Sequence, residues 1–150
     1  GRNVIACAPS HPLARKSAFK LSDIAPYSWI APPAGSPLYA DLKNALESIG
    51  IKDFRVSFTG GSLTSIISVM SGSESLTVLP YSVVFMQAHT KTITALPVKL
   101  EHPTRELGFL WRNDRVARPA VKRFQKFLET EFSSLAQRID EQGRTLVWRE

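Results

Sequence analysis

The residues best placed to bind a ligand form a short turn, Thr59-Gly60-Gly61-Ser62, between a strand pattern and a helix pattern. Its two glycines carry no side chains, so a ligand can approach the backbone closely. The first amides of a helix that begins after Ser62 have no partners within that helix and carry partial positive charge. This arrangement predicts a site for a carboxylate or phosphate group, and the alternative is a tight turn in which Ser62 is an ordinary helix cap.

Sequence patterns on either side indicate the elements that position this turn. Residues 56–58 and 76–79 alternate apolar and polar side chains, which is typical of strands. Apolar residues from Leu63 to Met70 recur at helical spacing, and Gly72 is a suitable stop for that helix. We therefore predict a strand, the turn, a helix and a second strand parallel to the first. The turn would lie beyond the carboxyl end of a strand, where open parallel sheets bind ligands.

A second turn of the same kind lies earlier in the chain. Trp29-Ile30-Ala31 predicts a short strand that ends at Pro32-Pro33-Ala34-Gly35. Ser36 followed by Pro37 predicts a helix start, because serine caps the helix and proline at the first position loses only an amide without a partner. We predict that the two helix starts face a common hollow.

The remaining sequence predicts further elements of an α/β fold. We predict strands at residues 4–8, 93–97 and 106–111, a helix at residues 81–86 and a long final helix from Pro119. The final helix carries the longest apolar stripe of the chain, formed by Val121, Phe124, Phe127, Leu128, Phe132 and Leu135. Such a stripe needs a sheet or a partner to cover it.

Composition limits the classes of protein that this chain can represent. Of the 150 residues, 43% are hydrophobic and 21% charged, as in a globular protein with one core or two small lobes. No apolar run reaches the roughly 20 residues that span a bilayer, and no leader pattern opens the chain, so we expect a cytoplasmic protein without a membrane partner. Many basic residues behind the net charge of +6 lie between Arg105 and Lys126, where acidic residues are interleaved. We expect no DNA-binding module in this chain.

No arrangement of residues predicts catalysis or metal binding. Cys7 lies in an apolar strand without a neighbouring base, and Ser62 lacks the surroundings of a catalytic serine. His11, His89 and His102 lie beside turns and do not have the spacing of metal ligands. We therefore expect no enzyme activity, no catalytic residue, no metal and no cofactor.

Several segments, taken in order, carry a resemblance to a known family. They are Ser10–Ala14, Leu21–Ala25, Tyr27–Ile30, Gly35–Leu38, Thr59–Met70, Leu76–Pro80 and Leu107–Arg112. The ordered set resembles the C-terminal part of the effector-binding domain of LysR-type transcriptional regulators, over about residues 3–128. No single segment is diagnostic, so the order of the segments carries the resemblance.

This resemblance implies an α/β fold similar to the type 2 periplasmic binding proteins, in which two lobes enclose a small molecule. One complete lobe and part of the other are expected here. Residues 1–27 would close a truncated lobe I, residues 28–106 would form lobe II, and residues 107–150 would return to lobe I with a C-terminal helix and tail. The opening part of lobe I and the family's N-terminal helix-turn-helix are expected to lie outside this sequence.

The resemblance also implies a binding site in two loops. Its residues would be Ala31, Pro32, Pro33 and Ser36 in one loop and Thr59, Gly60, Gly61 and Ser62 in the other. Members of the family often have a hydroxyl or amide side chain where Gly60 and Gly61 stand. More of the binding here would therefore fall to backbone amides, Thr59 and Ser62, and we expect a small anionic or polar metabolite as the effector.

The function implied by the resemblance is effector sensing, in which the metabolite controls DNA binding and transcription through rearrangement of an oligomer. DNA would be contacted only through a helix-turn-helix that is absent from this chain. We expect a homodimer or homotetramer, because the strands near Val4 and Leu107 and the stripe of the final helix would lack partners from lobe I. The alternative is a periplasmic-type solute-binding protein for transport, and a secretory leader upstream would distinguish it.

Overall fold

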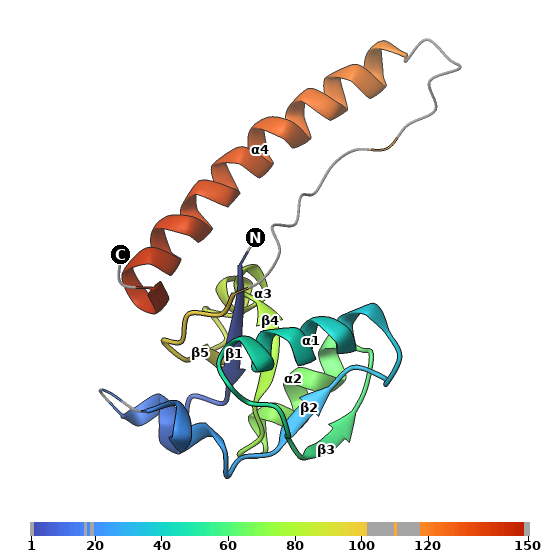
Figure 1. The fold of residues 1–150 in the computed structure, drawn as a ribbon. Coiled ribbons are helices and arrows are strands. Elements are labelled where there is room, and N and C mark those ends of the chain that lie inside the picture. The colour runs from blue at the N-terminus through green and yellow to red at the C-terminus, as the bar shows by residue number, and fades with distance from the viewer. Residues whose placement is uncertain (1, 17, 19, 102–109, 111–117, 149–150) are drawn as a thin grey trace. The chain divides into compact units, whose positions relative to one another are not determined.

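The computed structural model of the protein describes residues 2–16, 18, 20–101, 110 and 118–148. The chain divides into two units, Gly1–Thr104 and Arg105–Glu150 (Figure 1). The first unit contains strands β1 (Asn3–Cys7), β2 (Trp29–Ala31), β3 (Val56–Thr59), β4 (Thr77–Pro80) and β5 (Thr94–Ala95), helices α1 (Pro37–Ser48), α2 (Leu63–Ser71) and α3 (Tyr81–Met86), and the 3-10 helices η1 (Pro12–Arg15) and η2 (Leu21–Ile24). The second unit contains α4 (Pro119–Gly143) and the π-helical turn η3 (Arg144–Trp148).

The strands of the first unit are arranged in the order β3-β2-β4-β1-β5. β1 pairs antiparallel with both β4 and β5, whereas β2 and β3 pair in parallel. The two groups meet at a parallel bridge between Trp29 and Leu76, where Ile30 N donates to Leu76 O (2.8 Å) and Leu76 N donates to Ser28 O (2.9 Å). β2, β3, β4 and β5 therefore run in one direction, and β1 runs against them.

The central position of β1 corrects two expectations from the sequence. Val4 pairs with Leu79 and Ala6 with Ala95, so residues 1–27 share a sheet with residues 28–101 and do not close a different lobe. For the same reason the strand near Val4 has partners on both sides and is not an open edge. The apolar run of β1 fits this position, because a strand that is covered on both faces needs little polar surface.

Helices cover both faces of the sheet, as expected for an α/β fold. Alternate strand residues pack with α1 in a core cluster, which includes Ile5, Cys7, Trp29, Ala31, Leu42, Ala45 and Leu46. Their neighbours Val4, Ala6 and Ile30 face the other way and are fully buried. The connection from β2 to β3 runs one way along the sheet, and the connection from β3 to β4 runs back past β2. Right-handed crossovers therefore place α1 and α2 on opposite faces.

The helices of the first unit begin and end close to the predicted positions. α1 starts at Pro37, and Gly50 follows its end with a φ of 84°, a left-handed conformation that glycine adopts without strain. α2 starts after Ser62, and Gly72 is its C-cap. The predictions for these two helices and for the strands around them are confirmed.

The second unit is a single long helix with a folded end. α4 begins at Pro119, as predicted, and continues for 25 residues. The Trp148 ring packs against Gly143, and Arg144 forms an ion pair with Asp140 at 2.6 Å. The stripe on α4 is exposed, with Val121, Phe124, Phe127 and Phe132 each between 49% and 61% accessible. The strand predicted at residues 106–111 lies outside the described residues, apart from Leu110.

Candidate functional site

The two loops predicted to bind a ligand are neighbours in the structure. They follow Ala31 and Thr59, the last residues of β2 and β3, which pair with each other. Gly60 N also donates a hydrogen bond of 3.1 Å to Ala31 O, which joins the loops at their first residues. We call this side of the sheet, where β2, β3 and β4 end, the carboxyl edge.

The side chain of Ser36 caps the start of α1. Ser36 has an extended backbone, and its Oγ accepts a hydrogen bond of 3.2 Å from Tyr39 N. Ser36 N in turn donates to Pro33 O at 3.1 Å. Gly35 makes this tight turn possible, because its φ of 82° is one that side-chain-bearing residues rarely adopt. The serine cap predicted for α1 is confirmed.

The start of α2 is open, although it has the same type of residue at its cap. Ser62 also has an extended backbone, but its side chain accepts no hydrogen bond from the first turn of α2. Gly61, Ser62, Leu63 and Thr64 are exposed, so solvent or a ligand can reach the amides of this turn. An uncapped helix start presents several N–H donors and the positive end of the helix dipole, which together favour an anion.

The position of these two helix starts is typical of a ligand site in an open sheet. β2 and β3 are adjacent, and the helices that follow them lie on opposite faces of the sheet. This is the point where the strand order reverses, and the space beyond the strand ends there is the usual place for a ligand. The two helix starts therefore share one edge of the sheet. The common hollow expected between them remains a prediction.

The eight predicted site residues all lie on these two loops or on the strand ends before them. Ala31 is buried, Pro32, Ser36 and Gly60 are partly buried, and Pro33, Thr59, Gly61 and Ser62 are exposed. Residues 31–40 and 56–73 contain no charged side chain. Any recognition of an anion here would therefore depend on backbone amides and hydroxyl groups. The binding role of these residues remains a prediction.

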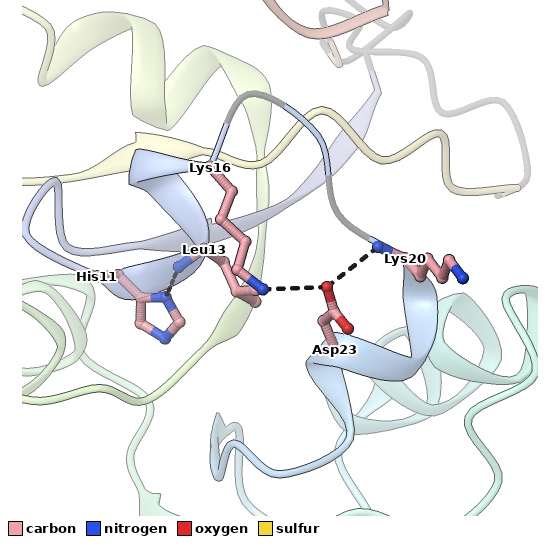
Figure 2. Close-up of polar contacts among 5 residues, drawn as sticks. All are labelled: His11, Leu13, Lys16, Lys20 and Asp23. Carbon is pink, nitrogen blue, oxygen red and sulfur yellow. Dashed lines mark hydrogen bonds and ion pairs between the residues drawn. The ribbon is translucent and has the colours of Figure 1, made fainter.

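A second polar cluster, which sequence reasoning did not predict, lies at the opposite side of the sheet, the amino edge, where β2, β3 and β4 begin. His11 is only 1% exposed, and its ring lies 4.4 Å from the ring of Tyr27. His11 Nδ1 accepts a hydrogen bond of 3.1 Å from Leu13 N (Figure 2), and His11 Nε2 lies 3.2 Å from Glu74 O. Because Leu13 N–H can only donate, these contacts fix a neutral ring whose Nε2–H donates to Glu74 O.

Burial and partners explain the protonation behaviour of this edge. Desolvation lowers the pKa of His11, while the backbone carbonyl and the charge of Glu74 act in the opposite direction. Nearby, Asp23 Oδ2 accepts from Lys16 Nζ (3.2 Å) and from Lys20 N (3.3 Å), as Figure 2 shows. These hydrogen bonds, that of Lys16 first, lower the pKa of Asp23.

Three serine hydroxyls complete the amino edge. Ser75 Oγ lies 2.9 Å from Ser57 Oγ and 3.2 Å from Ser28 Oγ, which links the beginnings of β4, β3 and β2. Nothing in the local sequence around these serines indicates the contact, since they are 18 and 47 positions apart. The cluster ties the beginnings of three strands together around the buried Ser75.

The residues weighed for catalysis have structural surroundings. Cys7 is buried in the core, and burial raises the pKa of its thiol to about 12, so it is a neutral, unreactive thiol at neutral pH. Within the described parts of the chain, no three His, Cys, Asp or Glu side chains are grouped so that they could hold a metal ion. Among the described helices, none is both long and apolar enough to cross a membrane.

Comparisons with known proteins agree with the fold described above. Residues 2–133 match the family described as the LysR substrate binding domain. No functionally curated protein matches the chain. Three similar solved structures are a protein from Vibrio parahaemolyticus described as a transcriptional regulator (16% identity, TM-score 0.71), the regulatory domain of CcmR from Synechocystis in complex with 2-PG (18%, 0.60) and the effector-binding domain of QuiR in complex with shikimate (20%, 0.53).

The alignments cover most of this chain but only part of each solved structure. The alignments cover 91%, 85% and 84% of this chain, and 64%, 61% and 58% of the respective structures. The chain therefore spans less than two thirds of the length of each of these structures. At such identities the likeness concerns the fold, which is the type 2 periplasmic-binding-protein-like α/β fold predicted from the sequence, present as part of a domain.

Proposed function

The chain belongs to the LysR substrate binding domain family, and we propose that it senses a small anionic effector for a bacterial transcriptional regulator. The observation that carries this proposal is the open start of α2 at the switch point of the sheet. Ser62 leaves the first-turn amides of α2 without a side-chain cap, directly beside the junction of Ala31 and Gly60. A carboxylate or phosphate oxygen would complete the hydrogen bonds that Ser62 does not make.

The choice of a polar anion rests on the groups that the two loops offer. Backbone amides donate hydrogen bonds without adding a charge, so they recognise an oxyanion through direction and dipole. Thr59 and Ser62 add exposed hydroxyl groups, which can donate to the same ligand or to its neighbouring polar atoms. Two structural relatives were solved in complex with small molecules, shikimate and 2-PG, which supports a small molecule as the ligand.

We propose that binding is transmitted as a change in the arrangement of regulator subunits in the cytoplasm. A ligand shifts a conformational equilibrium only by as much as its affinities for the two states differ. The effector must therefore bind the two states of the cleft unequally, and DNA would be contacted by a separate helix-turn-helix module. The family favours this regulatory role over the solute-binding protein for transport.

The test is a titration of the full-length protein with a panel of small carboxylates and phosphates, followed by amide chemical shifts and sedimentation velocity. We expect a binding acid to shift the amides of residues 61–65 first. Gly61→Asp should weaken that affinity about tenfold or more, because a fixed carboxylate competes for the same donors and repels the ligand.

Gly61→Asn is the matched control, since it has the shape of aspartate without the charge. Both variants should fold, because Gly61 is exposed and a Cβ added there meets no atom within 4 Å. We expect Gly61→Asn to retain the affinity within about threefold, as a surface change without charge. Equal binding by the two variants, or shifts confined to other residues, would remove the start of α2 from the site.

A further inference from the structure

The two glycines of the candidate site differ in what surrounds them. A Cβ added to Gly60 would lie 2.6 Å from Cε1 of Phe58, which is closer than real Cβ atoms come to a neighbour, and 3.1 Å from Cζ, which is an unusually tight contact. A Cβ added to Gly61 would meet nothing within 4 Å. The ring of Phe58 therefore occupies the room that a side chain at position 60 would take, while Gly61 is open.

The ring of Phe58 lies on the side of the sheet where α2 begins. Phe58 pairs with Ile30, which faces away from the core cluster under α1, and Phe58 is not part of that cluster. Phe58 as a whole is only partly buried, so the residue keeps some accessible surface. Leu63, at the first position of α2, is 42% exposed. Apolar surface thus lies beside the open amides of α2.

We propose that Phe58 is a specificity-determining residue of the effector site, and that it selects acids with a flat or cyclic apolar body over short-chain acids. This inference rests on the proposed function. The amides of α2 would hold the acid group, and the face of the Phe58 ring would pack against the body of the ligand. Gly60 is needed in this arrangement, because any side chain there displaces the ring.

The experiment compares benzoate with acetate as probes, with both dissociation constants measured on the full-length protein by calorimetry or amide shifts. The wild type should bind benzoate more tightly than acetate. Phe58→Ala should reduce the ratio of the two affinities about fivefold, which corresponds to the loss of one aromatic packing contact, and leave acetate binding nearly unchanged. Val56→Ala, on the same strand but farther along the chain from Gly60, is the control and should keep the ratio.

A second variant tests the same contact without removing the ring. Gly60→Ala should move the end of the Phe58 side chain, which is flexible, and reduce the benzoate preference in the same direction. This variant also covers the case in which Phe58→Ala fails to fold.

The outcomes separate this inference from the proposed function. Binding of both acids by the wild type with an unchanged ratio in the folded variants overturns the role of Phe58 alone. Binding of neither acid by the wild type contradicts an anion site at α2 and overturns both proposals. A reduced ratio in Phe58→Ala or Gly60→Ala, with Val56→Ala unchanged, supports Phe58 as the selecting residue.

Discussion

The two edges of the sheet in the first unit differ in how their polar groups are hydrogen-bonded. At the amino edge, both ring nitrogens of buried His11 have partners, and the hydroxyl of Ser75 is linked to two other serines. At the carboxyl edge, Ser62 leaves the start of α2 uncapped, and Gly61 is exposed with free space around it. The polar side chains of His11 and Ser75 at the amino edge are therefore paired within the protein. At the carboxyl edge, the first amides of α2 are available to a ligand.

This difference indicates how the sheet separates stability from recognition. A buried polar group that is paired contributes to stability, and losing its partner costs about 1–3 kcal/mol. A helix start without a cap gives up about 1 kcal/mol of stability, but its amides remain available to a ligand. We therefore expect changes at the amino edge to alter folding and changes at the carboxyl edge to alter binding.

We expect His11→Ala, at the amino edge, to have the largest effect on stability. It would leave Leu13 N–H and Glu74 O without their partner and open a cavity beside Tyr27, so we expect a loss of about 3 kcal/mol in the free energy of unfolding. Urea denaturation followed by the fluorescence of buried Trp29 measures this loss. His89→Ala, at an exposed position, should change stability by less than about 0.5 kcal/mol. Altered effector affinity in folded His11→Ala protein would show that the edges are not separate.

A finer comparison uses the two serines that precede α1 and α2. Ser36→Ala removes a hydrogen bond to Tyr39 N and should cost about 1 kcal/mol of stability. Ser62→Ala removes no cap bond and should cost less than about 0.5 kcal/mol. Thermal unfolding of the two variants under the same conditions measures both values. Equal losses would mean that Ser62 caps α2 in solution and that the α2 amides are not open.

The smallest expected effect is a pH dependence that belongs to the amino edge. Burial lowers the pKa of His11 below its ordinary value of 6.5, so the unfolded chain binds more protons than the folded one between these two pKa values. The contribution of neutral His11 is therefore complete above about pH 6.5 and is lost as the pH falls below that value. The backbone carbonyl of Glu74, which accepts from the His11 ring, and the charge of Glu74 both act to raise the pKa and so moderate this loss.

Urea unfolding at pH 7.5 and 5.5, on the wild type and on His11→Gln, isolates the contribution of His11. The wild type should lose more stability than the variant between these two pH values, since glutamine does not titrate. A variant with the same pH dependence as the wild type would assign the effect to other groups.

The local elements of the first unit were predictable because their signals lie in short stretches of sequence. The spacing of apolar residues from Leu63 to Met70, with Gly72 behind them, is sufficient to define α2. The parallel direction of the strands on either side of α2 was also predictable, because a crossover helix normally returns the chain in the same direction. These features needed no knowledge of distant contacts.

Other features were not predictable, because they depend on which distant groups meet. Ser36 and Ser62 look equivalent in sequence, yet only the first makes its cap bond. The apolar run of β1 is compatible with a strand of either lobe. Only its pairing with β4 shows which sheet β1 belongs to. His11 was expected beside a turn, whereas a carbonyl 63 positions away makes it part of the buried structure.

The pairing of β1 with strands far along the chain also affects how the unit assembles. Val4 pairs with Leu79, about 75 positions later in the chain, and Ala6 also needs Ala95. Contacts at such separations form slowly, because the intervening chain must first give up its freedom. During synthesis the first strand emerges from the ribosome long before either neighbour exists. The sheet can therefore close only after residue 95 has emerged, and a nascent chain stopped earlier would expose the most apolar strand of the unit.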